Sequence, residues 1–302
     1  MTNLWKHILR TQNENFQINC LLAQRNIYSN AKILQIILFV IAVIIPVALA
    51  FFIKYYPQIL NEKNSIYCLY LVLALASEKV LEYFIKRKKK IAASIQELFD
   101  RKVLLIKENN TLDRISVDEE IIRNYSRKAS KNAKKVREVV DWYSKEVFKL
   151  KTNVATVLCQ RTNIYYDFSV RDNYKIFLYL VVITTFVILL IFSLWNDNSI
   201  KSFLIEVLIP TIPIFNFVYK EINQNNESID NLKCLKEIIE NILQNIKNTT
   251  EIDEKKIREI QDRIFLNRIL NPLIPDYLYK ILRPRLEDEM NYSIEQKINQ
   301  LR

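Results

Sequence analysis

The sequence predicts an all-α integral membrane protein, with four transmembrane helices in two hairpins and a helical cytoplasmic domain. The clearest observation is the run Ile176–Trp195, which contains no charged residue. A helix needs about 20 apolar residues to cross a hydrocarbon core about 30 Å thick. Half of the residues are apolar and 25% are charged, yet the two kinds are separated along the chain. No segment follows the strand period for more than a few residues, so no sheet is expected.

The first hairpin is predicted over residues 33–85, after a polar, helix-compatible N-terminal segment over residues 1–32 that we expect in the cytoplasm. Its first span, Ile33–Ile53, is predominantly apolar and contains Pro46. Because proline removes a backbone donor, it should kink this helix or mark a packed position. The second span, Ile66–Ile85, is weaker because charged side chains occupy its second half.

The charges in that second span, Glu78, Lys79 and Glu82, have two interpretations. In the first, the apolar part ends near Ala76, and the charges lie at the cytoplasmic interface or pair with another helix. In the second, Glu78 and Glu82, which are one helical turn apart, line the pore of an oligomer. The basic run Arg87–Lys90 follows directly, as expected at a cytoplasmic membrane surface.

Residues 86–174 are predicted to form a cytoplasmic helical region. Ile91–Lys107 is the first expected helix, and Ser116 or Asp118 is a candidate N-cap for the next one. Apolar residues then recur at steps of three and four, which predicts one long amphipathic helix with a heptad-like seam. These residues are Ile122, Tyr125, Ala129, Ala133, Val136, Val140, Tyr143, Val147 and Leu150. The basic residues of the opposite face are Arg127, Lys128, Lys131, Lys134, Lys135 and Lys145. That face is either simply solvated or attracts an anionic lipid surface or ligand.

The second hairpin is predicted over residues 175–219. Its first span is the charge-free run described above, and its second, Phe203–Tyr219, is near the short limit for crossing a bilayer. The second span contains Pro210 and Pro213, with Glu206 near its outer end. A short span with two prolines suits a packed or pore-lining helix, because neighbouring protein must satisfy the freed carbonyls.

Residues 220–302 are predicted to form the C-terminal cytoplasmic helices. These helices cover Glu221–Asn248, Glu251–Leu270 and Ile274–Arg302, the last of them broken at Pro284. Each hairpin has one loop that joins its two spans. Lys and Arg are rare in these two loops and frequent outside the spans. The positive-inside rule therefore places both termini in the cytoplasm.

Several function classes have no support in the composition. The chain has no glycine, so it lacks the phosphate-binding loops and nucleophile elbows that need one. Its single histidine, His7, excludes histidine triads and clusters, and its four cysteines have no metal-binding or disulfide spacing. We therefore expect neither an enzyme nor a metal site or cofactor. The net charge of +11 is attributed to cytoplasmic segments and anionic headgroups rather than to nucleic-acid binding.

Several short motifs occur in a fixed order along the chain. They are Leu21–Lys32 (LLAQRNIYSNAK), Trp142-Tyr143, Cys159–Asn163 (CQRTN), Arg171–Tyr174, Ile274–Asp276, Arg283–Arg285 and Met290-Asn291. Together with the four spans, they resemble the SMODS-associating four-transmembrane effectors, a family of bacterial pore-forming effectors. The resemblance covers essentially the whole chain. Tyr166-Asp167 stands where the family has Trp-Asp after the CQR segment, which is a conservative aromatic change.

The resemblance implies a role in antiphage defence. In such systems a cGAS-like nucleotidyltransferase senses phage and makes a cyclic oligonucleotide, and a membrane effector then breaches the inner membrane of the infected cell. By this resemblance we expect a multi-pass protein of the bacterial inner membrane that forms homo-oligomers in the lipid bilayer. Its functional partner would be the nucleotidyltransferase.

A cyclic oligonucleotide that is sensed directly needs cations for its phosphates and aromatic rings for its bases. The candidate ligand-binding residues within the motifs are Arg25, Tyr28, Trp142, Tyr143, Gln160, Arg161, Asn163 and Arg171. The alternative is that these residues are helix caps, snorkelling anchors and interfacial aromatics. The candidate pore-lining residues are Glu78, Glu82, Glu206, Pro210 and Pro213. We expect ligand binding to reorganise the cytoplasmic helices and to open a path along the pore-lining residues.

Two other functions are compatible with the same patterns. A constitutive ion channel or transporter would explain the spans, although the spans carry few substrate-binding polar groups and the cytoplasmic part is larger than a carrier needs. A membrane-anchored scaffold or receptor subunit would explain the helices without any pore. Cell death on expression with the activator separates the effector from both alternatives.

Overall fold

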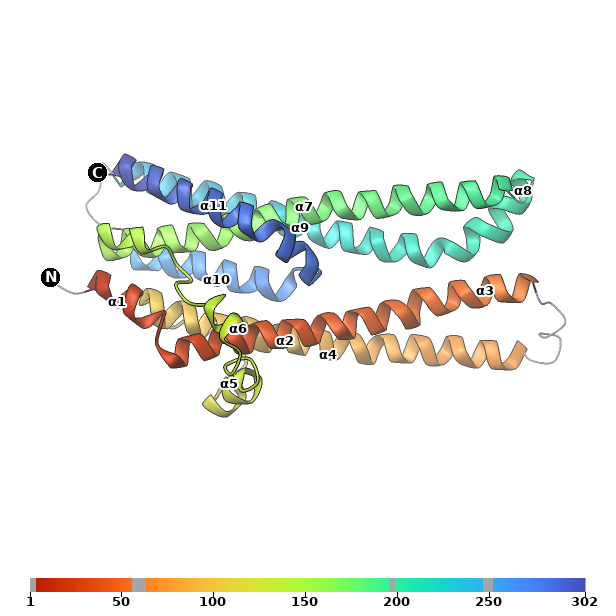
Figure 1. Ribbon diagram of the computed structural model, residues 1–302, viewed down its shortest axis with the longest axis horizontal. Coiled ribbons are helices and arrows are strands. Elements are labelled where there is room, and N and C mark those ends of the chain that lie inside the picture. The colour runs from red at the N-terminus through yellow and green to blue at the C-terminus, as the bar shows by residue number, and fades with distance from the viewer. Residues whose placement is uncertain (1–3, 56–63, 196–198, 247–251, 302) are drawn as a thin grey trace.

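The computed structural model describes residues 4–55, 64–195, 199–246 and 252–301. The regular secondary structure of these residues is helical, which confirms the predicted all-α class. The chain forms an elongated bundle whose helices lie roughly along one long axis (Figure 1). We call the half that holds both ends of the chain the head, and the other half the shaft. The shaft comprises residues 33–55, 64–85, 175–195 and 199–219, and the head comprises the other described residues.

The elements in chain order are α1 (Leu4–Thr11), α2 (Asn15–Phe39), the π-helical turn η1 (Val40–Ile44), α3 (Ile45–Tyr55), α4 (Asn64–Leu104), α5 (Glu119–Ser126), α6 (Ala133–Arg137), the 3-10 turn η3 (Lys145–Lys149), α7 (Thr152–Trp195), α8 (Ile200–Ser202), the π-helical turn η4 (Phe203–Leu208), α9 (Ile209–Asn245), α10 (Glu254–Leu270) and α11 (Asp276–Leu301).

Long helices connect the head to the shaft without a break. α4 has 41 residues and α7 has 44, so each of them joins an apolar segment to a polar one. At about 1.5 Å per residue, α7 is about 66 Å long, which is roughly twice the thickness of a hydrocarbon core. Each hairpin leaves the head and returns to it, so the end of α3 and the start of α4, like the end of α7 and α8, lie at the far end of the shaft (Figure 1).

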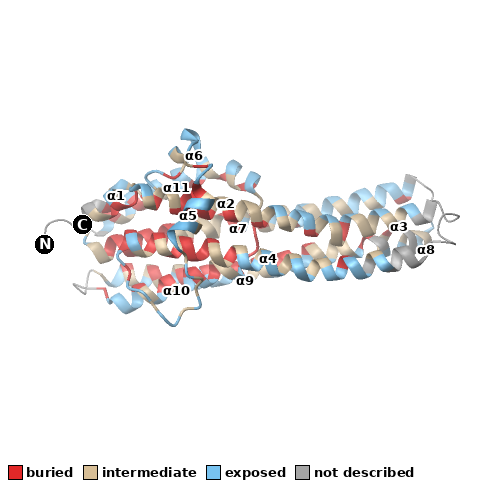
Figure 2. Cartoon of the chain, turned by 90° about the horizontal axis from the view of Figure 1, so that it is seen from below, coloured by how far each residue is buried: buried red, intermediate tan, exposed pale blue. Residues whose placement is uncertain are grey.

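Large apolar side chains are exposed along the whole shaft. Examples from its four helices are Ile36 at 62%, Leu75 at 64%, Leu194 at 68% and Ile212 at 45% exposure. Figure 2 shows that the buried residues gather in the head, whereas the described residues of the shaft are mostly exposed or intermediate. A contiguous exposed apolar surface of this extent is typical of a region that contacts lipid or another protein.

Two helical stretches are long and apolar enough to cross a membrane, Asn15–Leu49 and Thr152–Leu194. Only 11% of the most apolar window of each is buried, so neither is the core helix of a soluble domain. The expected spans on α4 and α9 are not among the stretches found in the described part of the chain. The charges of α4 and the short apolar part of α9 weaken both signals, and the four-span topology therefore stays a prediction.

The head has a hydrophobic core to which α2, α4, α7, α9 and α10 contribute. Its largest buried side chains include Phe99, Tyr143, Leu158 and Leu232. A second cluster lies beside the shaft, where α11 packs against α7 and α9 around Tyr174. Burial of apolar area is the main stabilising contribution in both places.

The predicted long helix over residues 122–150 is wrong. The chain there forms α5, α6 and η3, with turns between them. Asn132 and Ser144 cap two of these elements with their side-chain oxygens, and Asp141 adopts a left-handed conformation with φ 53°. These local features end a helix, although the apolar side chains still pack on the head. The buried apolar residues described in this segment are Ile122, Ala129, Val139, Tyr143 and Val147. The expected N-cap is confirmed, because Asp118 accepts a hydrogen bond from the amide of Ile121 at 2.8 Å.

Helix α11 continues through Pro284, so the predicted break at this residue is also wrong. A proline inside a helix removes one hydrogen bond and crowds the preceding turn. Ion pairs one turn apart lie on both sides of it, because Arg283 pairs with Glu287 at 2.6 Å and Arg285 pairs with Glu289 at 3.4 Å. Such pairs stabilise a helix by a few tenths of a kcal/mol each, and they offset part of the cost.

A π-helical turn precedes a proline in each hairpin. Pro46 follows η1 and Pro210 follows η4, each as the second residue of the next helix. Pro46 has no N–H for the carbonyl of Ile41, and the hydroxyl of Tyr70 on α4 donates to that oxygen instead, at 2.7 Å. Since α3 and η1 also pack against α9, Pro46 marks a packed position in the shaft. π-helical turns are rare in proteins and are frequent at functional sites.

Candidate functional site

The interior of the head contains two carboxylates on α4, Glu97 and Asp100, both 0% exposed. Asp100 accepts a hydrogen bond from the hydroxyl of Tyr143 at 2.7 Å and forms a salt bridge with Arg268 at 2.6 Å. Glu97 forms a salt bridge with Arg258 at 2.7 Å. Both arginines belong to α10, so these pairs fasten α10 to α4. Breaking either pair would leave a buried charge without its partner.

Gln261 connects the two ion pairs. Its amide nitrogen donates to Glu97 at 2.8 Å and to Asp100 at 3.1 Å, and its oxygen accepts from Gln160 at 3.1 Å. Burial raises the pKa of Glu97, and the neighbouring Arg258 opposes that rise. The charge of Glu97 therefore depends on the partners that α10 provides.

Three of the predicted ligand-binding residues, Tyr143, Gln160 and Asn163, lie in this interior network. Asn163 donates to the hydroxyl of Tyr143 at 3.0 Å, and Gln160 also donates to the carbonyl of Ile257 at 3.0 Å. Burial raises the pKa of Tyr143 well above its usual value, and the nearby Asp100 adds to the rise. Tyr143 and Gln160 are buried, so a ligand reaches them only if the head opens.

Arg171 and Tyr28 lie in a second polar layer, between the head core and the shaft. Arg171 forms a salt bridge with Asp167 at 3.0 Å and donates to the carbonyl of Pro272 and the side-chain oxygen of Asn225, each at 3.4 Å. Burial raises the pKa of Tyr28 to about 12. The contacts of Arg171 hold α7 to α9 and to the loop before α11, as expected of a structural residue.

Arg161 directly follows Gln160 in α7, but its side chain contacts α9 and α11 instead of the interior network. It donates to Glu240 at 2.6 Å and to the hydroxyl of Ser293 at 2.9 Å, and its guanidinium lies 4.0 Å from the centre of the Tyr165 ring. Burial acts to raise the pKa of Glu240, but hydrogen bonds from Lys297, Arg161 and Tyr165 outweigh it and lower this pKa to about 2. The guanidinium of Arg161 is thus bound to side chains of its own protein.

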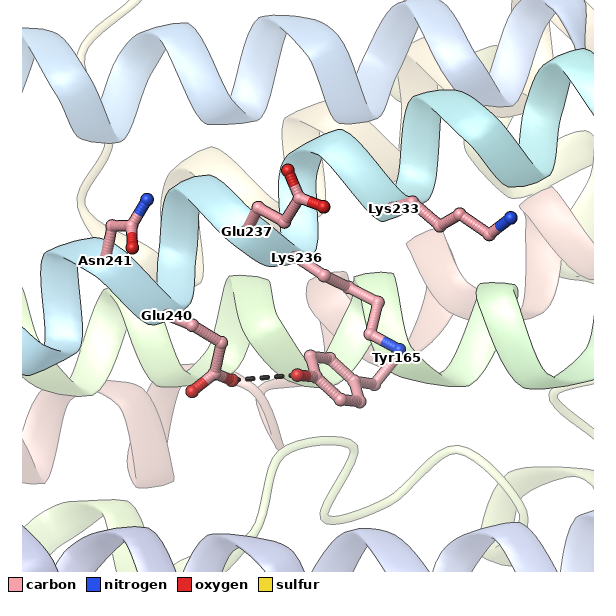
Figure 3. A pocket seen from close by; sticks show the side chains of 6 residues that line it. All are labelled: Tyr165, Lys233, Lys236, Glu237, Glu240 and Asn241. Atoms are coloured by element: carbon pink, nitrogen blue, oxygen red, sulfur yellow. Dashed lines mark hydrogen bonds between the residues drawn. The ribbon is translucent and has the colours of Figure 1, made fainter.

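A groove of about 540 Å³ opens on the head beside Glu240. The residues that line it are Tyr165, Lys233, Lys236, Glu237, Glu240 and Asn241 (Figure 3). The hydroxyl of Tyr165 points to Glu240 and donates to it at 2.8 Å, whereas Lys236 lies 4.2 Å from the centre of the Tyr165 ring. Two cations and two carboxylates line the groove, so it has no net preference for an anion.

Arg25 and Trp142 are the two predicted ligand-binding residues that meet on a partly exposed surface of the head. Nη1 of Arg25 lies 3.3 Å from the carboxylate of Glu138, and the guanidinium lies 5.6 Å from the centre of the Trp142 ring. A second arginine, Arg283 of α11, lies 3.7 Å from the same carboxylate. Both guanidiniums also donate to the backbone carbonyl of Glu138, at 3.2 Å and 3.1 Å. We call Arg25, Glu138, Trp142 and Arg283 the arginine cluster.

The arginine cluster has the chemistry of a site for an anion. Two guanidiniums converge on one carboxylate and one carbonyl, next to an indole ring. Burial lowers the pKa of Arg25, and repulsion from Arg283 lowers it further. The side chains of Arg25 and Glu138 are 34% and 40% exposed, so solvent and solutes reach this contact. A phosphate group would satisfy both guanidiniums as well as the Glu138 carboxylate does.

The predicted pore residues on α4 are found where the head meets the shaft. Glu82 forms salt bridges with Lys220 of α9 at 2.9 Å and with Lys79 at 3.8 Å, and Glu78 is half-buried. The contact with Lys220 matches the interpretation in which these charges pair with another helix. A pore between several chains stays a prediction for both glutamates.

The predicted pore residues on the fourth span lie in η4 and α9. Pro213 is inside α9, and the hydroxyl of Thr211 donates to the carbonyl of Leu208 at 2.8 Å one turn earlier. The backbones of Glu206 and Pro210 belong to η4 and α9, and their side chains lie outside the described part of the structure. Helix α9 therefore continues through its prolines from the shaft into the head.

The sequence patterns did not indicate the carboxylates Glu97, Asp100, Glu138 and Glu240. A signal was present for the first two, because Ala93, Glu97, Asp100 and Leu104 follow each other at steps of four, three and four. Acidic residues on the apolar face of a helix indicate buried ion pairs. No such signal exists for Glu138, which belongs to a segment without a regular period.

Two kinds of reactive group occur among the described residues, side chains of the metal-ligating types and cysteine thiols. No group of His, Cys, Asp or Glu in the described part of the chain is arranged to hold a metal ion. Cys20 and Cys159 are free and buried, and Cys234 is free and exposed. Burial raises the pKa of Cys20 to about 12, which makes this thiol unreactive.

Comparison with known proteins gives a match over nearly the whole chain. The sequence model of the SMODS-associating 4TM effector domain matches residues 6–297. A protein of Bacillus cereus (strain VD146), described as a probable CBASS effector molecule, is 28% identical over 298 residues. The alignment covers 95% of this chain and 96% of that relative. No solved structure matches the chain significantly.

Proposed function

Because the chain belongs to the family of SMODS-associating 4TM effectors, we propose that it permeabilises the bacterial inner membrane as the effector of an antiphage system. Its similarity to a probable CBASS effector supports the defence role. In this proposal a cGAS-like nucleotidyltransferase makes a cyclic oligonucleotide, the head senses that ligand, and the shaft acts on the membrane. The proposed activity needs no catalytic group.

The observation that carries the proposal is the separation of two surfaces along one molecule. Apolar side chains are exposed on all four helices of the shaft, whereas the buried residues gather in the head (Figure 2), which also holds most of the salt bridges. We propose that the shaft crosses the membrane four times and that both termini lie in the cytoplasm. The proposed membrane hairpins are residues 33–85 and 175–219, and the cytoplasmic parts are residues 1–32, 86–174 and 220–302.

We propose that sensing takes place at the arginine cluster. A phosphate of the ligand would replace the carboxylate of Glu138 on Arg25 and Arg283, and a base would stack on Trp142. The other predicted ligand-binding residues are held by neighbours inside the head or beside α9. They would respond to the ligand through rearrangement of the helices that they connect, rather than by contact with it.

The proposed opening step is a rearrangement of the shaft in a homo-oligomer. The pair Glu82–Lys220 joins α4 to α9, so movement between these helices would free Glu82 and, one turn away, Glu78 to line a path between chains. The π-helical turns before Pro46 and Pro210 provide places where the shaft helices can bend. A ligand drives such a change only as far as it binds the open state more tightly than the closed state.

The proposal is tested by the membrane potential of cells that express the full chain with or without the partner nucleotidyltransferase. Depolarisation only in the presence of the nucleotidyltransferase is the expected result. Depolarisation without it would instead favour a constitutive channel. No depolarisation in either case, with the protein confirmed in the membrane, would favour a membrane-anchored scaffold and contradict the proposal. The matched variants are Arg25→Gln, expected to abolish the response at the wild-type level of nucleotidyltransferase, and Lys256→Gln, at an exposed residue of α10, expected to preserve it.

A further inference from the structure

The segment that carries α5 and α6 presents a basic surface without acidic partners. We call this surface the basic ledge, and it consists of Arg123, Arg127, Lys128, Lys131, Lys134 and Lys135. All six side chains are exposed, and none of them forms a salt bridge with a residue that the structure describes. The nearby acids are Glu119 and Glu120, one turn before Arg123 in α5, and Glu138, one turn after Lys134 and paired with Arg25. With six cations and three nearby acids, the ledge keeps a net positive charge.

The basic ledge lies beside the boundary between the head and the shaft. The side chain of Asn26 on α2 donates to the carbonyl of Tyr125 at 2.8 Å, and the ammonium of Lys88 on α4 lies 5.8 Å from the centre of the Tyr125 ring. Figure 1 shows α5 and α6 beside the long helices, on the head side of the middle of the molecule. These contacts fix the height of the ledge along the bundle.

That height coincides with the start of the exposed apolar surface. On α4, Phe84 is four residues from Lys88, on the side of the shaft. Phe84 and Tyr83 are 44% and 61% exposed. Four residues correspond to about 6 Å along a helix. The electrostatic attraction of an anionic surface extends over a Debye length, about 8 Å at physiological salt. The ledge therefore lies within reach of lipid headgroups around the shaft.

We infer that the basic ledge binds the anionic headgroups of the membrane in which the shaft is embedded. Lysine and arginine side chains beside a bilayer are attracted to anionic lipids, and a compact group of six acts together. The inference rests on the proposed membrane placement of the shaft and is independent of any pore or nucleotide. Because the same segment carries Glu138 and Trp142, lipid binding would hold half of the arginine cluster at a fixed height over the membrane.

The test uses the full chain reconstituted in nanodiscs of phosphatidylcholine alone or of phosphatidylcholine mixed with phosphatidylglycerol. Acetylation of individual lysines is followed by mass spectrometry. We expect Lys128, Lys131, Lys134 and Lys135 to react several-fold more slowly in the anionic discs, and high salt to remove the difference. The matched internal controls are Lys255 and Lys256, which are exposed on α10 and are expected to react equally in both discs.

Equal rates for the ledge lysines in both discs would overturn the inference. Protection of these lysines by added single-stranded RNA, without any effect of phosphatidylglycerol, would also overturn it and would indicate a nucleic-acid surface instead. Resistance of the protein to alkaline extraction from membranes is measured in parallel. A chain that is extracted would contradict the membrane placement itself, whereas an inserted chain with unprotected lysines would contradict only the ledge.

Discussion

The carboxylate of Glu138 lies 3.3 Å from the guanidinium of Arg25, at a partly exposed position on the head. The two residues are 113 positions apart in the chain, and Arg283 from a third element approaches the same carboxylate. The contact holds the irregular segment after α6 against α2 and α11. An anion that competes with Glu138 would release this segment, and the arginine cluster is therefore the most direct place to alter the proposed switch.

Replacement Glu138→Gln removes the negative charge that occupies the two guanidiniums and keeps the size of the side chain. We expect this variant to respond to an about tenfold lower concentration of cyclic oligonucleotide, because the ligand no longer displaces an ion pair. The measurement is the depolarisation of cells in which the nucleotidyltransferase is titrated with an inducible promoter. Glu120→Gln, on the same segment but outside the cluster, is the control and should match the wild type. An unchanged response of Glu138→Gln would contradict this role of Glu138.

Replacement Tyr70→Phe removes the hydroxyl that donates to the carbonyl of Ile41 at the π-helical turn. Loss of a hydrogen bond to a partly buried carbonyl is expected to lower the free energy of unfolding by about 1 kcal/mol. Denaturant titration of the purified protein in detergent measures the change. Tyr83→Phe on the same helix is the control, because Tyr83 is 61% exposed, and it should change the stability little. Equal effects of the two substitutions would show that the turn does not depend on Tyr70.

Replacement Leu105→Gly is expected to stabilise the protein. Leu105 follows α4 and has φ 55°, a left-handed conformation that glycine adopts without cost. The amide of Ile106 donates to the carbonyl of Arg101 at 3.1 Å, which closes the helix end. We expect a gain of about 1 kcal/mol in the free energy of unfolding. In contrast, Leu266→Gly, at a similarly exposed leucine inside α10, should lose about 1 kcal/mol. A loss at both positions would contradict the strain at Leu105.

The stability of the head should depend on pH through Glu240. The pKa of this carboxyl is lowered from the usual 4.5 to about 2 in the folded protein, so the folded state favours the ionised form. The stabilisation is complete above about pH 5 and is lost as the pH falls from about 4.5 to about 2. After solvent screening we expect it to be on the order of 1 kcal/mol. Wild type and Glu240→Gln should therefore differ in thermal midpoint at neutral pH and converge near pH 2. A difference that is the same at both pH values would contradict this assignment.

The helical class was predictable because the apolar runs and the helical periods are local properties of the chain. The run Ile176–Trp195 and the motif before it form the single helix α7, as the uninterrupted pattern indicated. Over residues 122–150 the same kind of pattern was misleading. The apolar residues at steps of three and four belong to two short helices, a 3-10 turn and the turns between them, which pack on the head. There the side-chain oxygens of Asn132 and Ser144 accept hydrogen bonds from backbone amides, and these local bonds set the structure against the periodicity.

The arrangement of the candidate site was less predictable than the fold. Eight residues were proposed from the motifs, but the structure distributes them over the interior network, the layer next to the shaft, the side of α9 and the arginine cluster. Glu138 and Arg283 are 145 positions apart, so no local pattern indicated that they meet. Long-range contacts of this kind follow from how α2, α11 and the segment after α6 pack together, which the spacing of residues within each element does not contain.

We propose that an anionic ligand bound at the arginine cluster makes the shaft open a path for ions across the membrane. The most direct measurement is ion flux from liposomes that contain the purified full chain, with and without the product of the partner nucleotidyltransferase. We expect flux only when the product is present, and at least a tenfold higher product requirement for Arg25→Gln than for Lys256→Gln. Flux that is independent of the product, or a product that binds the protein without causing flux, would contradict the proposal.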